Sequence, residues 1–488
     1  MSYATARRRE ANAEMNKLYA EDRAVHEWYR FVLSFPPHLV RDYIRRFELT
    51  GQQRVLDPFC GTGTTVVECK KLGIPGVGIE ANPMADFASN VKVDWSPDPD
   101  GLINHARYVA DRAAAQLSAQ GIEDDPIFYS QSPNHSSLRS LPPERLKLLL
   151  ANSISPLPLH KTLILLDSLR ECCDDRYYRH ELLALAKALV DSISNLHFGP
   201  EVGVGPAKPD APVLALWQQA VRAIAEDLRQ IGSRNETPAV ILNGDSRRLV
   251  ELLEPRSIDA VITSPPYPNE KDYTRTTRLE SVILGFISDK ADLQELKRTL
   301  VRSNTRGVYK EDDDDQWVDA HPEIERIAAA IEARRLELGK TSGFERMYAR
   351  VTRLYFGGMA RHLADLRTIL RPGAQLAYVV GDQASYLRVM IRTGKLLADI
   401  AQALGYELVG IDLFRTRLAT ATKEQLREEV VVLRWPGSLP HHVTGHVHGL
   451  LEQAGPVQSH NANRTHSSTV NPKRAVQQDP RAPTAMPK

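Results

Sequence analysis

The hydrophobic positions of the chain follow two rhythms that alternate along its length. Short apolar runs bounded by turn residues predict buried strands, and apolar residues at three- and four-residue spacing predict helices. The predicted strands are residues 54–57, 76–80, 239–245, 259–263, 375–382, 406–414 and 429–435. The main helices predicted around them are residues 10–31, 39–47, 65–72, 213–231, 355–370 and 391–404. This alternation indicates an α/β fold with a mostly parallel sheet that ends in a C-terminal antiparallel hairpin.

The parallel-sheet rhythm stops after residue 90 and resumes at residue 239. Most of the intervening residues have helical spacing, and the Gly- and Pro-rich segment 198–210 predicts an extended loop. A second helical excursion covers residues 275–345, and its acidic run 311–315 predicts a solvated loop. We therefore expect N-terminal helices with the first half of the sheet over 1–95, a helical insertion over 96–237, the second half of the sheet over 238–437 and a disordered tail over 438–488.

The composition, with 42% hydrophobic and 25% charged residues in a chain of 488, predicts a soluble globular protein. No apolar run approaches the ~20 residues that span a bilayer, and the N-terminus lacks the apolar core of a signal peptide. The four cysteines have neither zinc-type spacing nor the pattern of a disulfide framework, which predicts a reducing cytoplasm and no metal site. They are Cys60, Cys69, Cys172 and Cys173.

The charge balance bears on possible partners. A net charge of +1 gives no global signature of a nucleic-acid-binding protein, so any such surface must be a local cluster of Lys and Arg. The C-terminal tail is rich in histidine, and we interpret it as a solvated tail rather than a metal site. The histidines concerned are His441, His442, His446 and His448.

The segment Ser264-Pro265-Pro266-Tyr267 follows an apolar strand. Because proline has no backbone N–H, the two prolines create an edge that accepts hydrogen bonds but does not donate them. Such an edge suits a flat, donor-bearing group such as the exocyclic amine of a nucleobase, with Tyr267 as a stacking face. The alternative is an ordinary turn.

A glycine-rich turn follows the first strand in Asp57-Pro-Phe-Cys-Gly-Thr-Gly-Thr-Thr65. Gly61 and Gly63 allow the backbone to pass close beneath a ligand at the carboxyl end of that strand. Glu80 ends the second strand, where a carboxylate typically binds ribose hydroxyls. The alternative for Glu80 is a helix cap before Asn82.

Together, the Asp57-to-Thr65 loop and Ser264-Pro-Pro-Tyr267 resemble the amino-group DNA methyltransferases, which use S-adenosylmethionine. The resemblance covers residues of about 25–90 and 238–436 and implies a three-layer α/β fold with a Rossmann-like methyltransferase sheet. It implies cofactor contacts at Phe35, Pro36, Pro37, Asp57, Phe59, Gly61, Gly63, Glu80 and Asp245, and catalytic positions at Ser264, Pro265, Pro266 and Tyr267. Asp245 would meet the adenine amine, although an Asp at a strand end is also a good helix cap.

The resemblance also implies the chemistry. The target base must leave the duplex stack, and its amine is methylated by direct in-line displacement with no covalent intermediate. Methylation at carbon 5 of cytosine is disfavoured, because the enzymes that perform it use a cysteine after a proline and no cysteine here follows one. Serine at the first motif position is typical of cytosine-N4 enzymes. Adenine N6, an RNA or protein amine, and a cofactor-sensing subunit without catalysis remain alternatives.

The implied partner is duplex DNA, in a setting compatible with a cognate restriction endonuclease. Arg275 and Arg278 follow the Pro-Pro segment and would share a helix face, where they could contact phosphates. The alternative is a helix salt-bridged to Glu280, Asp289 and Glu295. Further positive charge follows at Lys297, Arg298, Arg302 and Arg306. Target recognition could use the insertion 91–237 or the excursion 280–345.

Overall fold

The computed structural model describes residues 15–30, 34–124, 138–198, 202–232, 236–269, 271–418 and 425–438. Almost all of the predicted tail 438–488 lies outside these ranges. None of the described helices combines the length and the apolar character needed to cross a membrane.

A seven-stranded sheet forms the centre of the described molecule, in the order β5-β2-β1-β6-β7-β9-β8. Strands β5, β2, β1, β6 and β7 are parallel, and β9 pairs antiparallel with both β7 and β8. The strands are β1 (Val55–Asp57), β2 (Gly76–Glu80), β5 (Ala239–Asn243), β6 (Ile258–Thr263), β7 (Leu370–Gly381), β8 (Glu407–Leu418) and β9 (Gln425–Arg434). From β1 the chain adds β2 and β5 on one side, and then β6 and β7 on the other side, so the switch point lies between β1 and β6. The carboxyl ends of these two parallel strands therefore border a crevice.

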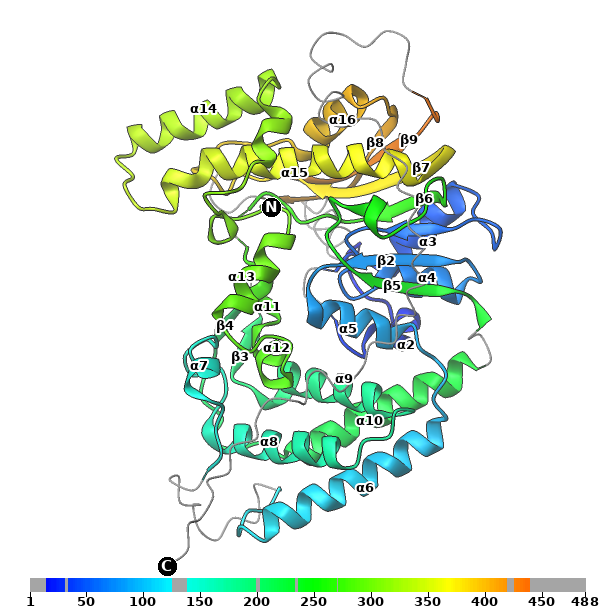
Figure 1. Ribbon diagram of the computed structural model, residues 1–488, viewed down its shortest axis with the longest axis vertical. Helices are drawn as coiled ribbons and strands as arrows, with labels where there is room; N and C mark the ends of the chain where they lie inside the picture. The colour runs from blue at the N-terminus through cyan, green and yellow to red at the C-terminus, as the bar shows by residue number, and fades with distance from the viewer. Residues whose placement is uncertain are drawn as a thin grey trace, which may run out of the picture.

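Alternating side chains of the strands face two different helical layers, as period-two strands require. Val55 and Ala260 pack with α3 (Pro37–Arg46), whereas Leu56 and Val261 pack with α15 (Tyr348–Ile369) and α16 (Thr393–Ala403). Figure 1 shows α15 and α16 above the sheet and the N-terminal helices on its other side. This arrangement confirms the predicted three-layer α/β fold with a mostly parallel sheet.

Local signals set the helices that follow the first two strands. Helix α4 (Thr64–Lys71) begins after Gly63, whose φ of 84° is left-handed. Helix α5 (Pro83–Lys92) has proline in its first turn, and the Asn82 side chain caps it by accepting from the Met84 N–H. Both helices therefore start at the carboxyl edge of the sheet, where the crevice lies.

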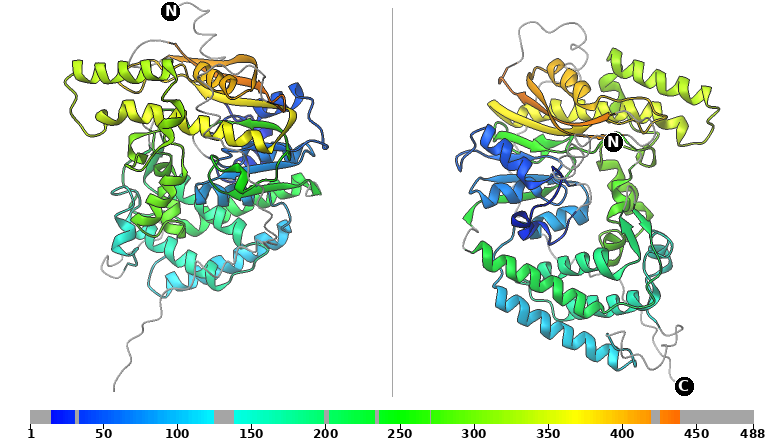
Figure 2. Two further views of the ribbon diagram at one scale, coloured as in Figure 1. Left: turned by 45° about the horizontal axis from the view of Figure 1, so that its top comes forward. Right: turned by 180° about the vertical axis from the view of Figure 1, so that it is seen from behind.

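The segment between β2 and β5 is helical and forms a separate layer at the lower end of the molecule in Figures 1 and 2. Apart from the short helix α7 (Pro143–Leu146), its helices share one hydrophobic core with α4 and α5. The helices of this layer are α6 (Pro99–Ser118), α7, α8 (Pro156–Glu171), α9 (Tyr178–Ala188), the π-helical turn η4 (Leu189–Ile193) and α10 (Val213–Ile231).

The prediction of an extended loop over 198–210 was wrong in part. Strand β3 (Leu196–Phe198) pairs antiparallel with β4 (Val202–Val204). Asn195 closes the base of this ribbon, because its backbone carbonyl accepts from Gly205 N at 2.7 Å and its side-chain carbonyl from Lys208 N at 2.8 Å. These long-range bonds leave no signal in a Gly- and Pro-rich sequence.

The helix predicted over 10–31 was also wrong where the structure describes it. The chain forms only short turns, η1 (Ala20–Asp22) and α2 (Arg23–His26), and Val25 has a left-handed φ of 69°. The Val25 N–H and the Trp28 indole N–H both donate to Asp227 of α10, at 2.8 and 2.7 Å. This tertiary anchor overrides the helical periodicity of the segment.

The excursion between β6 and β7 is mainly helical, as predicted. It contains α11 (Tyr273–Thr276), α12 (Arg278–Leu284), α13 (Lys290–Thr299), η7 (Thr305–Gly307), η8 (Asp314–Val318), α14 (Pro322–Glu337) and η9 (Glu345–Met347). Helix α12 and Leu296 of α13 belong to the same core as the insertion helices. The insertion thus supports the excursion from below, as seen along the left side of Figure 1.

Candidate active site

A cavity of about 600 Å³ lies at the carboxyl ends of β1, β2, β5 and β6, within the size range of small-molecule sites. One part is lined by the glycine-rich loop and by Glu80, and another by Ser264, Pro265, Pro266 and Tyr267. The two segments singled out in the sequence, about 200 residues apart, therefore border one continuous space.

The glycine-rich loop and the end of β2 are joined through one carboxylate. Glu80 Oε2 accepts from Gly61 N at 2.8 Å, and Glu80 Oε1 accepts from Asn82 N at 2.8 Å. Gly61 has a left-handed φ of 54°, which only glycine adopts readily. Burial raises the pKa of Glu80 to about 7. Asn82 caps the following helix, so that alternative role for Glu80 does not hold.

Asp57 lies behind the cavity wall, where it connects the ends of β1 and β6. Its Oδ1 accepts from Thr263 Oγ1 at 2.6 Å and from Phe59 N at 3.2 Å. Burial raises the pKa of Asp57 to about 6. Its Oδ2, and the hydroxyl of Thr62 on the cavity wall, are buried and have no hydrogen-bond partner among the described residues.

Of these two atoms, the Thr62 hydroxyl belongs to a cavity-lining residue and allows a test of whether the residues fit the implied cofactor. A buried polar atom without a partner is costly, and a polar ligand in the cavity would supply one. The left-handed Gly61 adds close backbone approach, and the phenyl ring of Phe59 adds an apolar wall that packs edge-on against His362, with 4.9 Å between the ring centroids. The donor and acceptor set at this end fits S-adenosylmethionine.

The Pro-Pro segment presents acceptors to the other end of the cavity. The Ser264 hydroxyl donates its proton to the Val379 carbonyl at 3.1 Å, which leaves lone-pair density on the hydroxyl oxygen for accepting. Pro265 and Pro266 line the cavity and carry no N–H. The arrangement therefore differs from an ordinary solvent-facing turn.

Two tyrosines face this end of the cavity. The ring of Tyr267 lies against Gly381, where an added Cβ would meet Tyr267 Cε2 at 3.0 Å. The backbone N–H of Tyr267 donates to the Tyr273 hydroxyl at 3.2 Å, and Tyr273 also lines the cavity. Burial raises the pKa of both phenols, so both stay protonated. Tyr273 was not predicted from the sequence as a site residue, although it lies only six residues after Tyr267.

The structure does not bring every predicted residue to the cavity. Phe35 lines it, but Pro36 and Pro37 do not, because Pro37 begins α3. Asp245 is not part of the lining either, although its neighbours Gly244 and Ser246 are.

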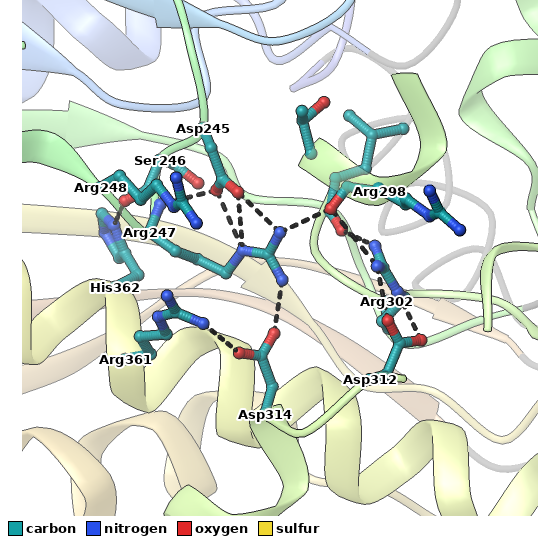
Figure 3. Close-up of polar contacts among 12 residues, drawn as sticks. Asp245, Ser246, Arg247, Arg248, Arg298, Arg302, Asp312, Asp314, Arg361 and His362 are labelled. Atoms are coloured by element: carbon teal, nitrogen blue, oxygen red, sulfur yellow. Dashed lines mark hydrogen bonds and ion pairs between the residues drawn. The ribbon is translucent and has the colours of Figure 1, made fainter. Parts of the chain in front are cut away.

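The carboxylate of Asp245 is occupied by Arg247. Arg247 donates to Asp245 through Nε at 3.0 Å and through Nη2 at 2.7 Å, as Figure 3 shows. The predicted contact of Asp245 with the cofactor adenine therefore has no geometric support. Gly63 is likewise absent from the lining and instead packs against Ser89, where an added Cβ would lie at 3.0 Å.

The predicted phosphate contacts at Arg275 and Arg278 are not arranged as expected. Arg278 donates to Thr274 Oγ1 at 2.6 Å and to the Thr274 carbonyl at 3.2 Å, and burial lowers its pKa. The alternative, a salt bridge to Glu280, also fails, because Glu280 is buried against the Tyr29 hydroxyl. The two arginines lie at the join of two short helices, and they do not share an exposed face.

The acidic run 311–315 is not simply a solvated loop. Asp314 is 3% exposed and binds Arg247 from one side and Arg361 from the other. Asp312 forms a two-bond pair with Arg302 at 2.7 and 2.8 Å. Figure 3 shows these pairs as one network. Arg302 in this network is itself one of the residues 299–304 that, with Gly307, line the cavity.

Among the described residues, no group of three or more His, Cys, Asp or Glu side chains has the arrangement to hold a metal ion. Cys60 lines the cavity, but burial raises its pKa well above the usual range. Its thiol is therefore protonated and 4% exposed, which is typical of a packing residue.

The chain is similar in sequence to known methyltransferases. Residues 5–86 match the N6/N4 DNA methylase family model. Over 448 residues the chain is 25% identical to the Type II methyltransferase M.BsoBI of Geobacillus stearothermophilus, with 85% of each chain covered. Over 442 residues it is 24% identical to the Type II methyltransferase M.AvaI of Anabaena variabilis, with 84% of this chain and 86% of the relative covered. The crystal structure of TrmN from Thermus thermophilus matches with a TM-score of 0.29 and 11% identity, over 85% of this chain and 52% of that one.

Proposed function

Because the chain belongs to the amino-group DNA methyltransferase family, we propose that it transfers methyl from S-adenosylmethionine to the N4 amine of cytosine at a specific DNA sequence. One observation carries the proposal: Glu80 with the glycine-rich loop and Ser264-Pro-Pro-Tyr267 line the same cavity. The matched family model, which is described as a DNA methylase, supports DNA as the substrate. We propose a restriction endonuclease blocked by the same methylation as a partner.

The cofactor end of the cavity would bind and orient S-adenosylmethionine, which supplies a methyl group activated by a positively charged sulfonium. Glu80 would accept hydrogen bonds from the ribose hydroxyls through lone pairs not used by Gly61 and Asn82. Thr62, which lines the cavity, would gain through its hydroxyl the partner that it lacks among the described residues. Asp57 would support the glycine-rich loop from behind through its bond with Phe59 N. Phe59 would keep water from this end.

The other end would bind an extruded base. The amine nitrogen of cytosine is a weak nucleophile, because its lone pair is delocalised into the ring. Acceptors at Ser264 and at the carbonyls of the Pro-Pro segment would hold the two N–H bonds and direct the lone pair toward the methyl group. Tyr267 would stack on the base face, which fixes its plane.

Base identity rests on Ser264. A serine at this position is typical of cytosine-N4 enzymes in the family, whereas asparagine or aspartate is usual for adenine N6. The high pKa and burial of Cys60 agree with a reaction that needs no cysteine nucleophile.

The substrate class can be tested by incubating the protein with S-adenosylmethionine carrying a labelled methyl group, together with duplex DNA or folded RNA. We expect label in DNA only, and a much lower rate with the Ser264→Ala variant. Label in RNA or in protein with none in DNA would overturn the proposal.

A further inference from the structure

The cavity wall that faces the sheet is a loop, and buried ion pairs and hydrogen bonds hold this loop in place. Residues 299–304 and Gly307 line the cavity. Arg302, 4% exposed, is locked by the two-bond pair with Asp312, and Arg247 donates to the Arg298 carbonyl at 2.8 Å. The loop is therefore pre-organised before any ligand arrives.

The outer side of the same region carries four exposed arginines that form no ion pair within the described residues. These are Arg298, Arg306, Arg346 and Arg388, which we call the arginine rim. Figure 3 shows the Arg298 guanidinium directed away from the buried network. By contrast, arginines on nearby α14 are neutralised locally: Arg326 pairs with Glu323 at 2.7 Å and Arg334 with Glu337 at 2.6 Å.

Contacts between segments bring the arginine rim together beside the cavity. Arg306 lies over the Phe344 ring at 5.7 Å, two residues before Arg346 in the chain. Tyr348 packs on Tyr386 at 4.9 Å, and the Tyr386 hydroxyl donates to the carbonyl of Ser303, a cavity-lining residue, at 2.8 Å. Arg388 follows Tyr386 by two residues.

The nearby acids do not cancel this charge. Asp312 and Asp314 are used in the internal pairs, and Asp315 faces Arg350 at 3.9 Å. Glu311 and Asp313 remain exposed, and neither is ion-paired to the arginine rim. Glu295, three residues before Arg298 on α13, is also exposed and has no ion pair among the described residues. Four cations against three acids leave a local excess of positive charge on a chain whose net charge is only +1.

From this we infer that the arginine rim binds the phosphates of the DNA strand on either side of the extruded base. The inference rests on the proposed function, and it assigns this role to the excursion and the turn after β7 instead of Arg275 and Arg278. Guanidinium groups without an acidic partner suit phosphate oxygens, and contacts beside the cavity would hold the strand once the base has left the stack.

The test compares two double variants that remove equal charge. Arg298→Gln with Arg306→Gln alters the arginine rim, and Arg326→Gln with Arg334→Gln is the control on α14. The affinity of each for a fluorescent mixed-sequence DNA duplex is measured over a series of salt concentrations. Each lost phosphate contact reduces the slope of log affinity against log salt by about 0.9, so we expect the slope to fall by roughly 2 in the rim variant and to stay unchanged in the control.

Binding of S-adenosylmethionine by the rim variant should equal that of the wild type. A rim variant with the control's slope, or one that loses cofactor binding as well, would overturn the inference. Methyl transfer to DNA by the wild type separates the two proposals: if transfer occurs and the rim slope is unchanged, only the rim assignment fails. If the wild type transfers no methyl to DNA, the proposed function fails, and the rim assignment that rests on it fails as well.

Discussion

At the residue scale, the two acids of the cofactor end lie in environments that disfavour their charge. Burial raises the pKa of Asp57 to about 6 and that of Glu80 to about 7. A binding site that leaves acceptors under-satisfied in this way costs stability before the ligand arrives and recovers it on binding.

This cost gives a pH dependence with a defined sign. Glu80 ionises near 4.5 in its usual state and near 7 in the folded protein, so the folded protein binds more protons than the unfolded chain between these values. Its contribution to stability is therefore present below about pH 4.5 and is lost as the pH rises to about 7. Since Glu80 is partly exposed to the cavity, we expect a loss of roughly 1–2 kcal/mol.

Urea denaturation of the cofactor-free protein between pH 4.5 and 8 checks this expectation. The decline in unfolding free energy should be smaller in Glu80→Gln than in the wild type, since glutamine does not titrate. Parallel curves for the two proteins would show that Glu80 is not the group responsible.

Tyr267 is expected to act through its ring. Tyr267→Ala should lower kcat/KM for DNA by roughly 10- to 100-fold, because stacking on a base contributes about 1–3 kcal/mol. Tyr267→Phe should retain most activity, and both should bind S-adenosylmethionine normally in a calorimetric titration. Full turnover by the alanine variant would exclude a stacking role, and a phenylalanine variant as poor as alanine would assign the role to the hydroxyl.

At the element scale, the buried network joins the turn after β5 to the start of η8 and to α15. Arg247 is 8% exposed and connects Asp245 with Asp314, which α15 also contacts through Arg361. Next to it, His362 of α15 contacts the Ser246 carbonyl and the Tyr378 hydroxyl, each at 2.7 Å. One cluster thus holds both a cofactor-side turn and the wall opposite the sheet.

Arg247→Leu should reduce the free energy of unfolding by about 3 kcal/mol, because it leaves Asp245 and Asp314 with less compensation for a largely buried charge. The matched control is Arg326→Leu, whose exposed pair should contribute less than about 1 kcal/mol. Urea denaturation at neutral pH measures both. Equal effects would mean that the network does not brace the wall.

The sheet elements could be predicted because their signals are local. Leu56 and Val261 belong to short apolar runs, and Gly61, Glu80 and Ser264 follow strand ends directly. What could not be predicted depends on partners far along the chain. Arg247, which pairs with Asp245, is also held by Asp314, 67 residues away, and Asp227 of α10 anchors the non-helical segment around Val25.

At the scale of the whole molecule, the cavity lies between the sheet and an excursion that the insertion supports. Leu279, Val282 and Leu296 of the excursion share a core with Trp217 of α10, so the insertion fixes the position of the wall. The views of Figure 2 show the insertion helices on the far side of the sheet from α14, α15 and α16. The insertion therefore positions the cavity wall that faces the sheet. The arginine rim lies on the side of this region toward α14 and η9.

The central claim is that this cavity methylates an exocyclic amine of DNA, at N4 of cytosine. The most direct measurement treats duplex DNA with the protein and S-adenosylmethionine carrying a deuterated methyl group, digests the DNA to nucleosides and identifies the labelled product by mass spectrometry. We predict labelled N4-methylcytosine from the wild type, and roughly 10- to 100-fold less from the Tyr267→Ala variant in the same reaction time. Labelled N6-methyladenine would contradict the choice of base, and labelled 5-methylcytosine would contradict the amine chemistry itself.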